Sequence, residues 1–145
     1  MPAKFAEQDI KSKLSNKRML SSFIDNQIKK TTKKTAALQY VFVSDDALLQ
    51  MNQQFLQHDT FTDIITFDLS ESPDKIIGEI YISIDRVTEN ANKFSTAYTA
   101  ELHRVIFHGA LHLCGYKDKT KADKETMRAM EDKWLKAYQQ VINNK

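Results

Sequence analysis

The stretch TAYTAELHRVIFHGALHLCG, residues 96–115, is the most informative segment of this 145-residue chain. Its apolar positions recur every three or four residues, and at 100° per residue they fall within about 100° of arc on one side of a helix. These positions are Tyr98, Leu102, Val105, Ile106, Gly109 and Leu113. The pattern predicts a helix over residues 96–114 that turns one face to a core, and Gly115 directly after it is a natural helix stop.

The flanking segments have the pattern of an α+β protein. β-branched and aromatic residues concentrate in three segments that we predict to be strands: residues 37–43, 62–69 and 76–84. Helical spacing of apolar residues predicts four more helices, over about residues 15–31, 45–57, 85–94 and 121–142. The length suits one domain spanning residues 1–145, in which a small mixed sheet packs against about five helices.

Composition and hydropathy narrow the class of protein. Cys114 is the single cysteine, so an intramolecular disulfide framework is excluded and a reducing compartment fits. No apolar run approaches the ~18 residues of a membrane span. The N-terminal segment also lacks the apolar core of a secretory signal. We therefore expect a cytoplasmic protein with no membrane partner.

The charge is distributed unevenly along the chain. The net charge is +2, but residues 1–35 carry nine basic and three acidic residues, and acidic residues are in excess over the rest. Lys29, Lys30, Lys33 and Lys34 lie around the end of the first predicted helix and are candidates for contact with nucleic acid. A solvated helix face explains the same lysines, and charge alone favours that second interpretation.

Two histidines on the central predicted helix carry the chemical signal. His108 and His112 are four residues apart, so both imidazoles lie on one face and can reach one ion. Gly115 allows the chain to turn back, and that return can carry Asp118 to the same ion. Three protein ligands with an open fourth position are the arrangement of a catalytic zinc. Chance spacing of the histidines, or a turn or helix-cap role for Asp118, is the simpler alternative.

The spacing also resembles that of zinc proteases, which carry a glutamate directly after the first histidine as their general base. Gly109 stands at that place here, so the base of a protease is missing. A glycine inside a helix costs about 1 kcal/mol relative to alanine, which predicts a close approach of another backbone or of substrate. On the helical wheel His103 points away from the metal pair and is expected at the surface. Cys114 is expected to pack rather than to bind metal.

Three blocks of the sequence resemble the YbeY family of bacterial metallo-endoribonucleases. HGALHLCGYKD, residues 108–118, resembles the family signature H-G-x-L-H-L-x-G-Y-D-H. NQQFLQHDTFTDIITF, residues 52–67, and Gly78-Glu79-Ile80 are similar to two further family blocks, in the same order. The resemblance implies an α+β fold with about four strands and a zincin-like metal helix. It also implies a Zn²⁺ held by His108, His112 and Asp118.

The family's activity is single-strand-specific cleavage of RNA in maturation of the 16S ribosomal RNA 3′ end and in ribosome quality control. The resemblance therefore implies ribosomal RNA, the ribosome and ribosomal proteins as partners. Two other functions stay open: a metalloprotease-like zinc hydrolase, and a non-catalytic ribosome-associated factor that contains a metal. The oligomeric state does not follow from the sequence.

Two positions depart from the family pattern. Asp118 stands where the family usually has a third histidine, and a carboxylate there favours harder ions, so Mn²⁺ or Ni²⁺ is an alternative to Zn²⁺. Leu56 stands where the family typically has an arginine that is thought to act on RNA phosphate. The catalytic base is not identified, and the candidates are His58, Asp59 and the phosphate of the substrate itself. Asp63 is expected either to orient a ligand histidine or to anchor the start of a strand.

Overall fold

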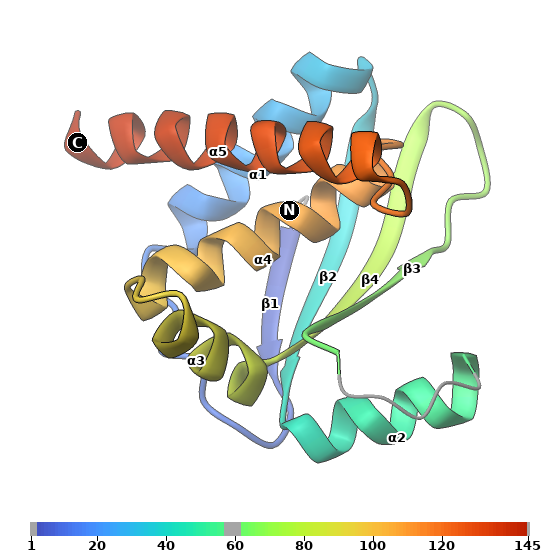
Figure 1. The fold of residues 1–145 in the computed structure, drawn as a ribbon. Helices are drawn as coiled ribbons and strands as arrows, with labels where there is room; N and C mark the ends of the chain where they lie inside the picture. Colours follow the sequence, from blue (N-terminus) through green and yellow to red (C-terminus); the bar gives the residue numbers. More distant parts are fainter. Residues whose placement is uncertain (1–2, 57–61, 145) are drawn as a thin grey trace.

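The computed structural model describes residues 3–56 and 62–144, and its centre is a four-stranded mixed sheet (Figure 1). The strands follow one another across the sheet in the order β1 (Ala3–Glu7), β2 (Thr35–Val43), β4 (Lys75–Ser83) and β3 (Ile64–Asp68). β1 is parallel to β2 and β2 to β4, whereas β3 is antiparallel to β4. In the described part of the chain, β1 and β3 are therefore the two edges of the sheet.

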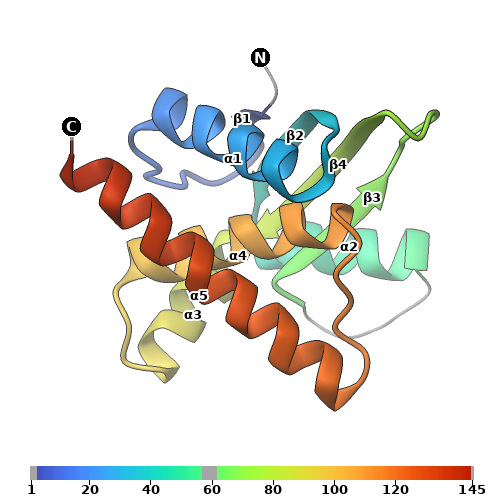
Figure 2. The same cartoon turned by 90° about the horizontal axis from the view of Figure 1, so that it is seen from above.

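Helices cover both faces of this sheet. They are α1 (Lys17–Thr32), α2 (Asp45–Leu56), α3 (Ile84–Lys93), α4 (Tyr98–Leu113) and α5 (Lys121–Asn143). Figure 2 shows α1, α3, α4 and α5 on one side of the sheet and α2 on the other. The predicted α+β class, with a small mixed sheet and five helices in the described residues, is confirmed. No helix among these residues is long and apolar enough to cross a membrane.

The N-terminal strand β1 is an element that the apolar pattern does not predict. It has five residues, AKFAE, without a β-branched side chain, and only Ala3 is buried. Its hydrogen-bond partners lie 35 positions further along the chain, where Phe5 pairs with Tyr40 of β2. The two rings stack with centroids 5.2 Å apart. Pairing with a distant strand, rather than local propensity, therefore makes this segment a strand.

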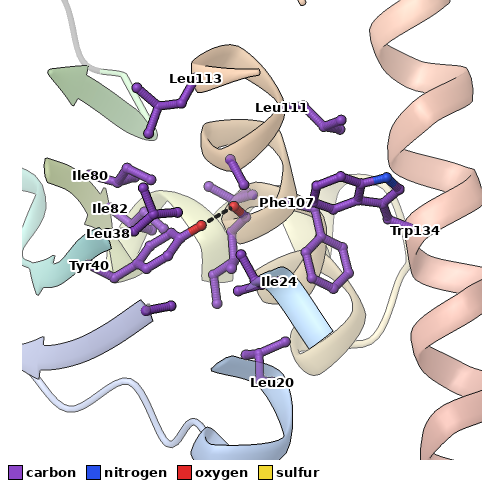
Figure 3. Close-up of a cluster of buried hydrophobic side chains, with 14 of the residues drawn as sticks. Leu20, Ile24, Leu38, Tyr40, Ile80, Ile82, Phe107, Leu111, Leu113 and Trp134 are labelled. Atoms are coloured by element: carbon purple, nitrogen blue, oxygen red, sulfur yellow. Dashed lines mark hydrogen bonds between the residues drawn. The ribbon is translucent and has the colours of Figure 1, made fainter. Parts of the chain in front are cut away.

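Helix α4 packs at the centre of the larger core, between the sheet and α5 (Figure 3). On the sheet side, the buried Tyr40 hydroxyl donates a hydrogen bond to the Ile106 carbonyl at 2.8 Å. On the α5 side, the Phe107 and Trp134 rings lie 5.7 Å apart. The predicted apolar stripe is thus only part of the buried surface, because Phe107, Ala110 and Leu111 are also fully buried.

Gly109 is a point of close approach between α4 and the sheet. A Cβ atom at this position would lie 2.9 Å from Ile80 Cγ2 and 3.1 Å from Ile64 Cδ1. The expected close approach is therefore real, but its partner is neither a backbone nor a substrate. The side chains of β3 and β4 fill the space, and this glycine lets α4 lie directly on them.

We expect Gly109→Ala to lower the free energy of unfolding. Overpacking costs about 1–3 kcal/mol, and the better helix propensity of alanine returns about 1 kcal/mol, so the net loss is about 0–2 kcal/mol. Urea denaturation of the variant measures this loss. In an Ile80→Ala background, which removes the nearest obstacle, the same substitution should stabilise the protein. An equal effect in both backgrounds would contradict this explanation.

His103 is not at the surface, contrary to the expectation from the helical wheel. Its ring is half-buried between α4 and α5, with centroids 5.1 Å from Tyr138 and 6.2 Å from Phe107. The helical wheel placed it away from the metal pair, but α5 packs on that side as well. Burial lowers the pKa of His103 below its ordinary value of 6.5.

The lowered pKa of His103 predicts a loss of stability in mild acid. The unfolded chain takes up a proton near pH 6.5 more readily than the folded chain, so stability is fully present above that pH and falls below it. We expect His103→Phe, which keeps a ring at this place, to flatten the decline. The test is to measure the free energy of unfolding of both proteins from pH 7.5 to pH 5. This range extends roughly one unit or more on either side of the ordinary histidine pKa. Parallel curves would contradict it.

Candidate metal centre

Three side chains converge where α4 ends, as the sequence predicts. His108 and His112 project from successive turns of α4, with ring centroids 4.8 Å apart. Asp118 Oδ2 lies 3.3 Å from His108 Nε2 and 3.2 Å from His112 Nε2. These are the three residues that can hold a metal ion in the described part of the chain.

The turn after α4 brings the carboxylate back to the histidines. Gly115 has φ = 108°, a backbone conformation that side-chain-bearing residues rarely adopt. Its N–H donates to the His112 carbonyl at 3.0 Å, and the next N–H, of Tyr116, donates to the Leu111 carbonyl at 3.1 Å. The predicted helix stop is therefore confirmed. Thr120, with a capping box to Asp123, caps α5, so Asp118 is not used as the helix cap.

Two of the three distances between the donor atoms match the spacing of a coordination shell, and all three atoms lie within 4.8 Å of one another. Zinc bonds of about 2.0–2.1 Å in a tetrahedron separate neighbouring donors by about 3.3 Å. The two distances from Asp118 Oδ2, 3.3 and 3.2 Å, match this separation. Two imidazole nitrogens and one carboxylate oxygen are also ordinary ligands of divalent ions. The residues present therefore fit a metal ion.

Glu131 of α5 is a functional candidate that the sequence reasoning missed. Its Oε2 lies 2.7 Å from His108 Nδ1, and its side chain is only 7% exposed. The Arg104 guanidinium holds the other oxygen, Oε1, at 2.9 Å and also contacts Asp132 at 2.6 Å. A carboxylate on Nδ1 fixes the tautomer of a histidine and leaves Nε2 free to bind a metal.

The charges around His108 favour its protonated form in the absence of metal. Burial alone would lower its pKa, but the hydrogen bond and charge of Glu131, with smaller contributions from Asp118 and Asp63, outweigh burial and raise the pKa. Burial raises the pKa of the Asp63 carboxyl. Asp63 was predicted to orient a ligand histidine, but the Nδ1 atom of His108 is already hydrogen-bonded to Glu131.

A cleft of about 620 Å³ opens in front of the three donors. Strand β3, the end of α3, one face of α4 along most of its length, and the first turns of α5 line it. Leu56, at the position of the family arginine, lies on its wall and is 45% exposed. The proposed catalytic residues His58 and Asp59 lie outside the described residues.

The basic end of α1 does not line this cleft. Lys29, Lys30 and Lys33 are exposed, as a solvated helix face would be, and Lys30 lines a separate groove between α1 and α5. Lys34 lies near enough to Cys114 to lower the pKa of its thiol, although burial dominates and raises that pKa to about 12. Cys114 packs against the core, as predicted.

The fold and the site define an α+β protein with a candidate metal centre carried on a helix of the pattern His-x3-His. The model of the family described as "Endoribonuclease YbeY" matches residues 4–139. The chain belongs to this family of endoribonucleases, and the resemblance seen in the sequence is confirmed.

Two relatives and one solved structure show the extent of the similarity. The "Endoribonuclease YbeY" of Cytophaga hutchinsonii is 49% identical over 88% of this chain and 90% of its own length. That of Parabacteroides distasonis is 43% identical over 93% of this chain and 94% of its own. The solution structure of TM1509 from Thermotoga maritima shares the fold, with a TM-score of 0.65 and 24% identity, over 98% of this chain and 92% of that one.

We expect Glu131→Gln to weaken metal binding about ten- to a hundredfold, because the amide is a weaker acceptor for the Nδ1 proton of His108. Titration of the metal-free protein with Zn²⁺ measures the affinity. Asp132→Asn is the matched control, since Asp132 contacts the same arginine but is 59% exposed and does not touch His108. Equal affinities of the two variants would show that Glu131 does not position the ligand.

Proposed function

We propose that this chain is a metal-dependent endoribonuclease that cleaves single-stranded RNA in the cleft in front of His108, His112 and Asp118. The observation that carries the proposal is the spacing of these three donors, 3.2 and 3.3 Å around Asp118 Oδ2, in the wall of an open cleft. Membership of an endoribonuclease family supports RNA as the substrate.

We propose one ion per chain, held by the Nε2 atoms of the two histidines and the carboxylate of Asp118. A bound divalent ion supplies a polarised phosphate oxygen or a hydroxide at neutral pH. Zn²⁺ is the first candidate. The carboxylate makes Mn²⁺ or Ni²⁺ an alternative, because its negative charge and hard oxygen suit harder ions. Glu131, anchored by Arg104, keeps His108 in the orientation that ligation needs.

Other residues of the chain are proposed to transfer protons and to bind the RNA phosphates. His58 and Asp59 are the proposed proton-transfer residues, and Asp63 is proposed to act on the ligand His108 by charge. Leu56 cannot bind phosphate, so another cation must take the place of the family arginine. We propose that Lys29, Lys30, Lys33 and Lys34 hold RNA outside the cleft by charge, since Lys29, Lys30 and Lys33 are exposed at the end of α1.

The biological setting that we propose follows the family. The substrate would be ribosomal RNA, at the 3′ end of the 16S species, and the protein would act in the cytoplasm on ribosomes and ribosomal proteins during maturation and quality control. The chain would act as one domain, since α4 carries two ligands and packs on the sheet and α5 alike.

A peptidase is the less suitable alternative. Its general base would have to replace Gly109, where even a Cβ atom would lie 2.9 Å from Ile80 Cγ2. A glutamate side chain has no room at this point of contact between α4 and the sheet. The geometry therefore favours the nuclease over the protease.

We expect His108→Ala and Asp118→Ala to reduce cleavage of single-stranded RNA by on the order of a hundredfold or more, because each removes a ligand of the ion. The assay compares metal-loaded proteins on one labelled RNA, with and without a chelator. His103→Phe, on the far side of α4, is the control and should cleave like the wild type. If the wild type and both ligand variants show the same trace cleavage, the nuclease proposal fails and a non-catalytic factor is the remaining function. Cleavage of casein in place of RNA would indicate a protease.

A further inference from the structure

Strand β3 forms one wall of the metal cleft along its length. On this side the cleft is lined by Thr62 and Asp63, which directly precede β3, and by Ile64, Ile65, Thr66 and Asp68 of the strand itself. β3 is also an edge strand: among the described residues it pairs with β4 alone. The outer edge of a sheet therefore faces the space in which the proposed substrate would lie.

The register of β3 shows which backbone groups point outward. The Ser83 N–H donates to the Asp63 carbonyl at 2.9 Å, and the Leu69 N–H donates to the Ile77 carbonyl at 2.7 Å. In an antiparallel ladder such paired residues alternate with residues that point their N–H and C=O to the other side. Ile64, Thr66 and Asp68 therefore turn their donors and acceptors to the free edge. One of these outward acceptors, the Ile64 carbonyl, already accepts a hydrogen bond from the Thr62 hydroxyl at 3.4 Å.

The two walls of the cleft differ in charge. The β3 wall carries the carboxyl groups of Asp63 and Asp68 and, among the described residues, no lysine or arginine. The opposite wall carries Arg104 and Arg128 together with the carboxyl groups of Glu101 and Glu131. Arg104 is held by Glu131 and Asp132, whereas Arg128 is exposed and acts on the Glu101 carboxyl group by charge, without an ion pair in the described part of the chain. A phosphate is therefore favoured at Arg128 and disfavoured beside β3.

We propose that single-stranded RNA lies in the cleft with its bases towards the free edge of β3 and its phosphates towards Arg128. This inference rests on the proposed function. Base edges present both donors and acceptors, as does a strand edge, whereas a phosphate only accepts. In a duplex the base edges are already paired, so this arrangement selects unpaired RNA. Arg128 then supplies from α5 the phosphate contact that Leu56 cannot make.

Two substitutions separate the roles of the two walls. Thr66→Pro removes one outward N–H and leaves the ladder bonds of Ile65 and Phe67, a change that edge strands tolerate. Thr66→Val is its control, because it keeps the N–H and loses only the hydroxyl. Arg128→Gln removes the proposed phosphate contact and keeps a polar side chain on the exposed face of α5.

The measurement is the affinity of metal-loaded protein for a short, nuclease-resistant 2′-O-methyl RNA as a function of salt. We expect Thr66→Pro to bind about three- to tenfold more weakly with an unchanged salt slope, and Thr66→Val to match the wild type. Arg128→Gln should bind more weakly with a slope shallower by about 0.7. Wild-type affinity of both Thr66→Pro and Arg128→Gln, or a shallower slope in Thr66→Pro, would overturn the proposal.

Amide NMR of the wild type gives a second test that does not depend on folding of the proline variant. The amide protons of Ile64, Thr66 and Asp68 should shift on addition of the RNA, and those of Ile65 and Phe67, within the ladder, should shift less. Unchanged amide shifts of β3 on addition of the RNA would overturn the proposal. It would also be overturned if these amides shifted only with an extended valine–threonine peptide, which can pair with a free strand edge, and not with RNA. If the wild type neither binds nor cleaves RNA, the proposed function itself fails. If it binds and only these variants and amides show no effect, the orientation alone fails.

Discussion

The close packing of α4 on the sheet is the constraint on which the site depends. At Gly109 the helix lies so near to the sheet that a Cβ atom would come within 2.9 Å of Ile80 and 3.1 Å of Ile64. This contact sets the height and rotation of α4, and therefore the direction in which His108 and His112 project. Because the neighbouring residues of α4 are buried against both the sheet and α5, the two imidazoles cannot turn away from the cleft without loss of core packing.

The second half of the site comes from the chain on the C-terminal side of α4. The positive φ of Gly115 returns the chain to Asp118, and α5 then crosses α4 so that Glu131 meets His108. The charges compensate one another: Asp118 faces both imidazoles, and Arg104 neutralises the buried Glu131. An ion pair buried in this way contributes little net stability, which is consistent with a role in positioning a ligand rather than in holding the fold together.

Local patterns predict much of this molecule, and distant contacts account for the rest. The helical period of α4, the spacing of its histidines and the glycine that stops it are features of one short segment, so the candidate ligand set could be predicted from sequence alone. β1 does not, because its pairing partner is far along the chain. Glu131 was detectable in principle: it stands in the buried stripe of α5 with Met127, Trp134 and Tyr138, and a charged residue at such a core position requires a partner. Which partner it has depends on how α4 and α5 cross.

The central claim is that His108, His112 and Asp118 form one metal site. X-ray absorption spectroscopy of the zinc-loaded protein, with the metal content determined on the same sample, tests it most directly. The account predicts one ion per chain, with two imidazole nitrogens in a first shell of only nitrogen and oxygen, and loss of one oxygen ligand in Asp118→Ala. A sulfur ligand from Cys114, or a shell that is unchanged in Asp118→Ala, would contradict it.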